Sequence, residues 1–178
     1  MKTSVTPMEV SLKPVERLIR KTLNKVVKSG DRGERWTRSE WTKHVKEAIF
    51  KIGRKKYVIT THGLGDRTEP QWLFDMAWSV ECGPKSAYLQ RLVLIAEFEW
   101  NRKAVDLDWD FQKLMVGRAD YRLFVFDQKS KEDVSIFIDR FVKQISMYQG
   151  TQEGDRYLFA GSSTDSNNFM VKAFSVKR

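Results

Sequence analysis

The spacing of apolar residues along the chain alternates between a helical period and the shorter runs typical of strands. Helical spacing predicts helices over 14–28, 37–52, 109–119 and 130–148. Runs rich in β-branched and aromatic residues predict strands over 56–61, 72–81, 91–100, 121–127, 156–162 and 169–176. Because long helices separate several of these strands, the pattern favours an α/β sheet with helices packed on both faces.

Local signals place the boundaries of several of these elements. Thr37 with Glu40 forms a capping box before the second helix, and Ser130 with Asp133 forms a similar pattern before the last one. The 178 residues suggest one domain over 13–178, with residues 1–12 as a flexible lead.

The positive charge of the chain is concentrated near its N-terminus. The whole chain has a net charge of +9, whereas residues 13–56 alone hold fifteen Lys and Arg against five Asp and Glu. A basic helical segment of this kind is the electrostatic footprint of nucleic-acid binding. An ordinary solvated basic face is the alternative, and a membrane surface is a weaker one. The candidate phosphate-binding residues on these helices are Arg17, Arg20, Lys21, Lys28, Arg38 and Lys43.

Carboxylates interrupt two of the predicted apolar strands. Asp75 lies inside WLFDMAWSVE, and Glu97 and Glu99 end RLVLIAEFEW. If these strands pair, the alternation of strand side chains can bring all three carboxylates together. Their mutual repulsion, and the cost of burying unpaired charges, would be relieved by a divalent cation. In the following DWDFQKL segment, Asp110 and Lys113 are three residues apart and share one side of the predicted helix.

These residues resemble the signature of the restriction-endonuclease-like superfamily, the PD-(D/E)xK nucleases, over roughly residues 41–127. In that family an acid on the second core strand precedes (D/E)-x-K on the third strand. Asp75 matches the first acid and Glu97 the second, but Phe74 replaces the usual proline. Glu99 stands at the lysine position and gives E-x-E, so Lys113 is the candidate for a lysine that has moved to the following helix.

The resemblance implies a restriction-endonuclease-like mixed sheet flanked by helices on both faces, and hydrolysis of phosphodiester bonds in DNA, or in RNA. Asp75, Glu97 and Glu99 would hold Mg²⁺ or Mn²⁺ through oxygen ligands. Lys113 would orient the attacking water or stabilise charge on the phosphate. A homodimer is also implied as an option, because family members that cut both strands often use two active sites.

Each of these residues can also be interpreted as purely structural, with no role in catalysis or metal binding. Asp75 could form a salt bridge with Arg91 or Lys56, the two glutamates could face solvent at a strand end, and Lys113 could be an ordinary surface lysine. Asp110 could be a metal ligand or could only stabilise the helix N-terminus. The rival function is a catalytically inactive protein of the same fold that binds nucleic acid or another protein.

Several other classes of function lack support in the sequence. One cysteine and two histidines are too few for a disulfide framework or a structural zinc site. The glycines around His62 lack the GK[ST] signature of a phosphate-binding loop. No apolar run reaches the ~20 residues of a membrane span, so the expected location is the cytoplasm.

The six tryptophans have two interpretations. Trp41 and Trp72 suit the core, whereas the other four lie near the ends of predicted elements and could line a groove that stacks bases. These four are Trp36, Trp78, Trp100 and Trp109.

Overall fold

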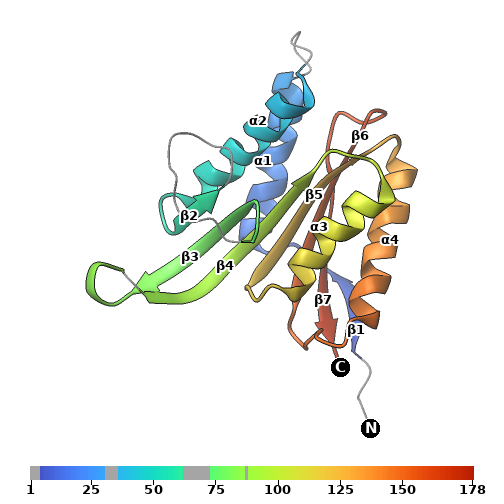
Figure 1. Ribbon diagram of the computed structural model, residues 1–178. Helices are drawn as coiled ribbons and strands as arrows, with labels where there is room; N and C mark the ends of the chain where they lie inside the picture. The colour runs from blue at the N-terminus through green and yellow to red at the C-terminus, as the bar shows by residue number, and fades with distance from the viewer. Residues whose placement is uncertain (1–4, 31–35, 62–72, 87) are drawn as a thin grey trace.

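A seven-stranded sheet lies between two pairs of helices in the computed structural model (Figure 1), which describes residues 5–30, 36–61, 73–86 and 88–178. The strands are β1 (Thr6–Val10), β2 (Val58–Thr61), β3 (Met76–Cys82), β4 (Tyr88–Glu99), β5 (Tyr121–Gln128), β6 (Arg156–Ser163) and β7 (Met170–Lys177). The helices are α1 (Pro14–Gly30), α2 (Arg38–Gly53), α3 (Ala104–Val116) and α4 (Lys131–Met147), with one short 3₁₀ turn, η1 (Pro84–Ser86).

The sheet is mixed, with strand order β1-β7-β6-β5-β4-β3-β2. Its centre is parallel, because β5 pairs in parallel with both β4 and β6. The remaining neighbours are antiparallel. The α/β class predicted from the sequence is therefore confirmed.

Two apolar cores cover the two faces of the sheet. Helices α1 and α2 cover one face of the sheet, and α3 and α4 cover the other (Figure 1). The core under α1 and α2 includes side chains of β3, β4 and β5, and the core under α3 and α4 is rich in phenylalanine. Phe111 of α3 is fully buried in that cluster, with its ring centroid 4.7 Å from that of Phe141 on α4. This packing fixes the position of α3, and therefore of Lys113, two residues further along the helix.

Both predicted helix caps are present. The Thr37 side chain accepts a hydrogen bond from the Glu40 backbone N–H, and the Glu40 carboxylate accepts one from the Thr37 backbone N–H. Ser130 accepts a hydrogen bond from the Asp133 backbone N–H in the same way. These bonds satisfy donors that a helix N-terminus otherwise leaves without partners.

Three predicted boundaries need correction. Residues 6–10, expected to belong to a flexible lead, form β1 and pair with β7, an edge position where Pro7 is tolerated. Helix α3 begins at Ala104 rather than at residue 109, with Asp106 in its first turn, where a negative charge is favourable. Strand β3 begins at Met76, so Asp75 immediately precedes the strand instead of lying inside it.

The basic segment 13–56 is attached to the sheet by a buried ion pair. Glu16 of α1 is fully buried, and its carboxylate accepts hydrogen bonds of 2.6 and 2.7 Å from the Arg156 guanidinium at the start of β6. The same carboxylate caps α1 by accepting from the Lys13 backbone N–H. The described helices include none that is long and apolar enough to cross a membrane.

Candidate functional site

A cluster of six titratable side chains lies where β3 begins and β4 ends. It is assembled from α2, the residue before β3, the end of β4, and α3. Its members are Lys46, Asp75, Glu97, Glu99, Asp110 and Lys113. The antiparallel register pairs Met76 with Ala96, which places the residue before β3 beside Glu97. The contact between Asp75 and Glu97 predicted from the sequence is therefore present.

Asp75 extends the contact between β3 and β4 by one residue beyond the Met76–Ala96 pair. Its carboxylate accepts a 3.0 Å hydrogen bond from the backbone N–H of Phe98, and its own backbone N–H lies 3.4 Å from a carboxylate oxygen of Glu97. Thr61, at the end of β2, donates a 3.2 Å hydrogen bond to the Asp75 carbonyl. These contacts hold the Asp75 side chain at the start of β3, where it is 25% exposed.

Lys46 of α2 is a member of the cluster that the sequence analysis missed. Its ammonium lies 3.0 Å from the Asp75 carboxylate and 5.4 Å from the centroid of the Phe98 ring, and the residue is only 5% exposed. The pairing of Asp75 with Arg91 or Lys56 considered from the sequence is wrong, because Arg91 pairs instead with Asp120. A signal was present, since Lys46 falls beside Val45 and three residues before Ile49, within the buried stripe of α2.

Glu97 and Lys113 form the centre of the cluster. The Lys113 ammonium lies 2.7 Å from the Glu97 carboxylate and 2.8 Å from that of Asp110, three residues earlier on α3. Glu97 is 1% exposed, whereas Lys113 is 24% exposed. Lys113 is therefore not an ordinary surface lysine, and its place beside the second acid is the one expected for a lysine on the helix after β4.

Glu99 lies at the end of β4 and contacts the same group. Its carboxylate accepts a 2.5 Å hydrogen bond from the Asn101 backbone N–H and shares a hydrogen bond with Asp110. The predicted alternative that Asp110 only stabilises a helix N-terminus is wrong, because α3 begins at Ala104 and Asp110 lies in the middle of the helix, where it pairs with Lys113 and interacts with Glu99.

Burial raises the pKa values of both glutamates. The pKa of Glu97 rises to about 8, mainly through burial and with a further contribution from Asp75, against the opposing effect of Lys113. The pKa of Glu99 rises to about 7, again mainly through burial, with added repulsion from Asp110 and Asp106. The pKa of Lys113 is raised by Asp110 and Glu97, which outweigh its own burial. The cluster thus combines carboxyl groups that titrate near neutral pH with a lysine that stays charged.

The raised pKa of Glu97 predicts a specific pH dependence of stability. The folded chain binds this proton more tightly than the unfolded chain, so between about pH 4.5 and pH 8 the free energy of unfolding should fall as pH rises. Glu97→Gln removes the titration. Between pH 5 and pH 8 the wild type should therefore lose about 3 kcal/mol more stability than the variant, as measured by urea denaturation. Parallel pH profiles for the two proteins would contradict this assignment.

The carboxylates of the cluster supply part of a binding site for a divalent cation. Asp75 and Glu97 offer oxygen atoms, the ligands that Mg²⁺ and Mn²⁺ prefer, and their charges are compensated here by Lys46 and Lys113. Within the described ranges, no group of three or more Asp, Glu, His or Cys side chains is arranged to hold a metal ion. Glu99 is therefore the third predicted ligand only if its side chain turns toward the other two.

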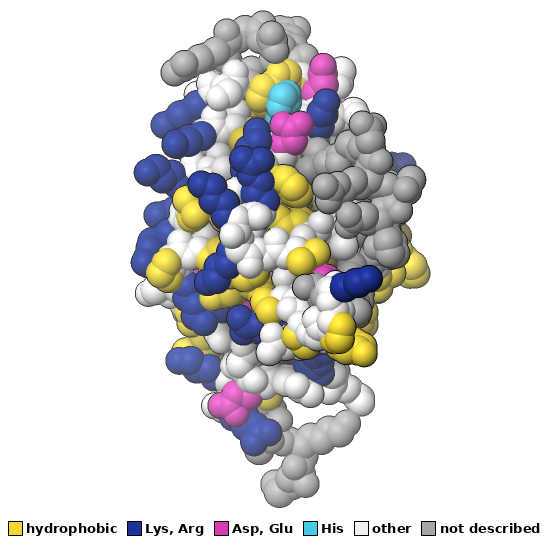
Figure 2. Space-filling view, turned by 90° about the vertical axis from the view of Figure 1, so that its left-hand side faces the viewer, with side chains coloured by type: hydrophobic (Ala, Val, Ile, Leu, Met, Phe, Trp, Pro, Cys, Tyr) yellow, Lys and Arg dark blue, Asp and Glu magenta, His cyan; other side chains and the backbone are white. Residues whose placement is uncertain are grey.

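The predicted phosphate-binding residues lie on exposed surfaces of the two basic helices. All six are exposed, and α2 also carries Lys46 of the cluster. Figure 2 shows Lys and Arg side chains gathered along one side of the face that carries these helices, with few acidic side chains among them. The six residues are Arg17, Arg20, Lys21 and Lys28 of α1 and Arg38 and Lys43 of α2.

The assignment of the tryptophans to the core or to a groove differs in part from the prediction. Trp78 is fully buried in the core and lines no groove, and Trp109 is 70% exposed on α3. Trp41, expected in the core, lines a cavity together with Trp36 and Trp100. Trp72 and the glycines around His62 lie outside the described residues.

Comparisons of the chain with protein-family models, with curated proteins and with solved structures each found no match.

Proposed function

We propose that the chain is a metal-dependent nuclease of restriction-endonuclease-like fold that hydrolyses phosphodiester bonds of DNA, or of RNA. One observation carries the proposal. Asp75, Glu97 and Lys113, which match the motif order of that superfamily, form a continuous set of contacts although they are widely separated in the chain. A purely structural ion pair would need only two of them, whereas this cluster joins four carboxyl groups and two lysines through successive pairwise contacts.

The residues of the cluster have distinct roles in this proposal. Asp75 and Glu97 would hold Mg²⁺ or Mn²⁺, with Glu99 as a further ligand, and water or phosphate oxygens would complete the coordination, as is usual for Mg²⁺. When bound, the cation supplies polarisation of the scissile phosphate and lowers the pKa of a bound water. Lys113, held between Glu97 and Asp110, would direct its ammonium to the phosphate oxygens or to the attacking water.

The exposed basic residues of α1 and α2 would bind the phosphate backbone and lead it to the cluster. Lys46 pairs with Asp75, so α2 carries both a member of the cluster and part of the exposed basic surface. Binding through these residues should weaken steeply with salt, because each phosphate contact releases counterions. A homodimer is part of the same proposal, because it would place one cluster at each of the two strands of a DNA duplex.

Metal binding should be accompanied by proton release. At pH 7 most of the Glu97 carboxyl groups retain a proton, because its pKa is about 8, and a metal ligand must lose that proton. Isothermal titration with Mn²⁺ in buffers of different ionisation enthalpy should therefore show a buffer-dependent heat corresponding to about one proton per bound ion from Glu97, and to about half a proton more when Glu99 is also a ligand.

The matched variants make this titration specific. Asp75→Asn and Glu97→Gln should abolish the Mn²⁺ signal, whereas Glu132→Gln, an exposed acid of α4, should leave it unchanged. Absence of Mn²⁺ binding by the wild type, combined with salt-sensitive binding of DNA, would favour the rival function. That rival is supported by the lysines that already pair with Asp75 and Glu97, and by the absence of a ready three-ligand group in the described residues.

A further inference from the structure

A cavity of about 290 Å³ lies beside the cluster, outside the carboxyl ends of the parallel strands. Trp100 directly follows β4, Asp127 is the penultimate residue of β5, and Ser162 and Ser163 end β6. The region outside the carboxyl ends of parallel strands is where open α/β sheets characteristically bind ligands. None of the four carboxyl groups of the cluster lines this cavity.

Three indole rings form the apolar part of the cavity. Trp36 precedes α2, Trp41 lies in its first turns, and Trp100 comes from the sheet. The ring centroids of Trp36 and Trp41 are 4.9 Å apart at 75°, and those of Trp41 and Trp100 are 6.3 Å apart at 42°. Neither pair is stacked in parallel, and the ring of Trp36 stacks instead on His44, with centroids 4.1 Å apart at 26°. Aromatic walls of this kind suit a flat, π-rich ligand.

The opposite part of the cavity is polar and held in place by hydrogen bonds. Arg102 donates to one carboxylate oxygen of Asp127 from two nitrogen atoms, at 2.8 and 2.7 Å. Ser162 donates to the other oxygen at 2.6 Å. A carboxylate has about four acceptor positions, so Asp127 can also accept from N–H groups on the edge of a nucleobase. Arg38, also in the lining, adds a positive charge suited to a phosphate.

The cavity and the cluster adjoin each other in the chain. Trp100 follows Glu99 directly, and successive strand side chains point to opposite faces. Lys46 of the cluster and Trp41 of the cavity lie five residues apart on α2. The cavity and the cluster therefore lie at the same end of β4, with Trp100 and Glu99 on opposite faces of the sheet, and a nucleic-acid strand that crosses this end of β4 would pass both.

We propose that this cavity binds an unstacked base of the nucleic acid, so that the substrate is single-stranded or locally opened at the site of cleavage. The proposal rests on the nuclease function and narrows its substrate class. A base inside a duplex cannot enter such a cavity without leaving the stack, which costs a few kcal/mol. Single-stranded or damaged nucleic acid avoids most of that cost.

The test separates the contribution of the bases to the binding affinity from that of the phosphates. Binding in EDTA is measured by fluorescence anisotropy for a single-stranded thymidine oligomer of about 15 nucleotides and for a fully abasic oligomer of the same length. The two probes carry the same phosphates. The wild type should bind the thymidine oligomer about 5- to 150-fold more tightly, the range that corresponds to about 1–3 kcal/mol for one stacked base.

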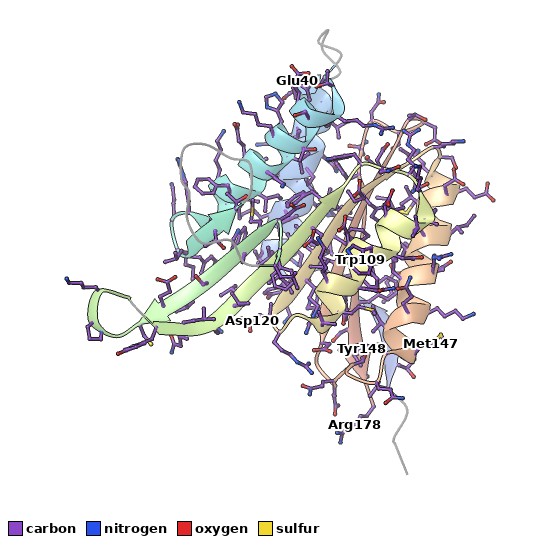
Figure 3. All side chains as sticks on the ribbon, in the orientation of Figure 1. Glu40, Trp109, Asp120, Met147, Tyr148 and Arg178 are labelled. Atoms are coloured by element: carbon purple, nitrogen blue, oxygen red, sulfur yellow. The ribbon has the colours of Figure 1, made fainter. Side chains whose placement is uncertain are left out.

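Variants then locate this preference. Trp36→Ala and Trp100→Ala should each reduce the affinity ratio toward one while leaving binding of the abasic oligomer unchanged. Trp109→Ala is the matched control, because this exposed indole lies on α3, away from α2 (Figure 3). If Trp100→Ala does not fold, Trp36→Ala and the wild-type ratio still decide the question.

The two proposals fail separately. An affinity ratio near one in the wild type, or an unchanged ratio in both folded tryptophan variants, overturns the base-binding cavity even if plasmid is cleaved in Mg²⁺. A clear ratio that both variants abolish supports the cavity, even if the protein cleaves no substrate and the nuclease function is thereby rejected.

Discussion

Replacing Lys113 by Gln should lower the rate of phosphodiester cleavage by about 10²- to 10³-fold, the usual cost of losing one aligned electrostatic donor. The lysine is only partly exposed and contacts both Glu97 and Asp110. Gln keeps most of the volume of the side chain but removes its charge. The rate is measured under single-turnover conditions, so that product release does not hide the chemical step.

The effect on metal binding should have the opposite sign. Since the Lys113 ammonium competes with a cation for the Glu97 carboxylate, Mn²⁺ should bind Lys113→Gln at least as tightly as the wild type. Lys143→Gln, an exposed residue of α4, is the control for the loss of one positive charge and should retain the wild-type rate. Loss of Mn²⁺ binding in Lys113→Gln, or an unchanged rate, would show that the lysine has a structural role only.

The second large effect concerns stability. Glu16→Ala should destabilise the fold by about 3–5 kcal/mol, because it leaves the Arg156 guanidinium buried without its carboxylate. Glu16 is fully buried and Arg156 is 7% exposed, so water cannot easily replace the lost partner. The same substitution removes the acceptor for the Lys13 backbone N–H at the start of α1. Urea denaturation followed by circular dichroism measures the difference.

An exposed ion pair of the same kind provides the comparison. Glu9 of β1 lies 3.5 Å from Lys172 of β7, and the two side chains are 57% and 32% exposed, respectively. Glu9→Ala should change the free energy of unfolding by less than about 1 kcal/mol. If Glu16→Ala were as mild as Glu9→Ala, the buried pair would not be what holds the basic helices on the sheet.

The sequence was sufficient to predict the parts of the fold that depend on local periodicity. The capping box at Thr37 and the long helix after Ser130 follow from side-chain spacing alone, and both are present. The short strand at residues 6–10 could not be predicted in this way, because its pairing partner, β7, lies at the other end of the chain. The Glu16–Arg156 pair has the same cause, since 140 residues separate its members.

The candidate site was predicted in part for similar reasons. Asp75, Glu97 and Lys113 could be named because a carboxylate in an apolar strand, and a lysine on the next helix, are visible in the sequence. Lys46 was missed because lysines of a basic helix are expected to be exposed, although its position between Val45 and Ile49 places it in the buried stripe of α2. The cavity was missed as a unit, because Trp41 and Trp100 become neighbours only when α2 packs beside the end of β4.

The central claim is that the cluster cleaves nucleic acid with the help of a divalent cation. The most direct measurement incubates supercoiled plasmid and single-stranded DNA with the wild type and with Asp75→Asn, in Mg²⁺, in Mn²⁺ and in EDTA. We predict cleavage of at least one substrate by the wild type with a divalent cation, none in EDTA, and none by the correctly folded Asp75→Asn variant. Cleavage that persists in Asp75→Asn, or a wild type that cleaves neither substrate with either cation, would contradict the assignment.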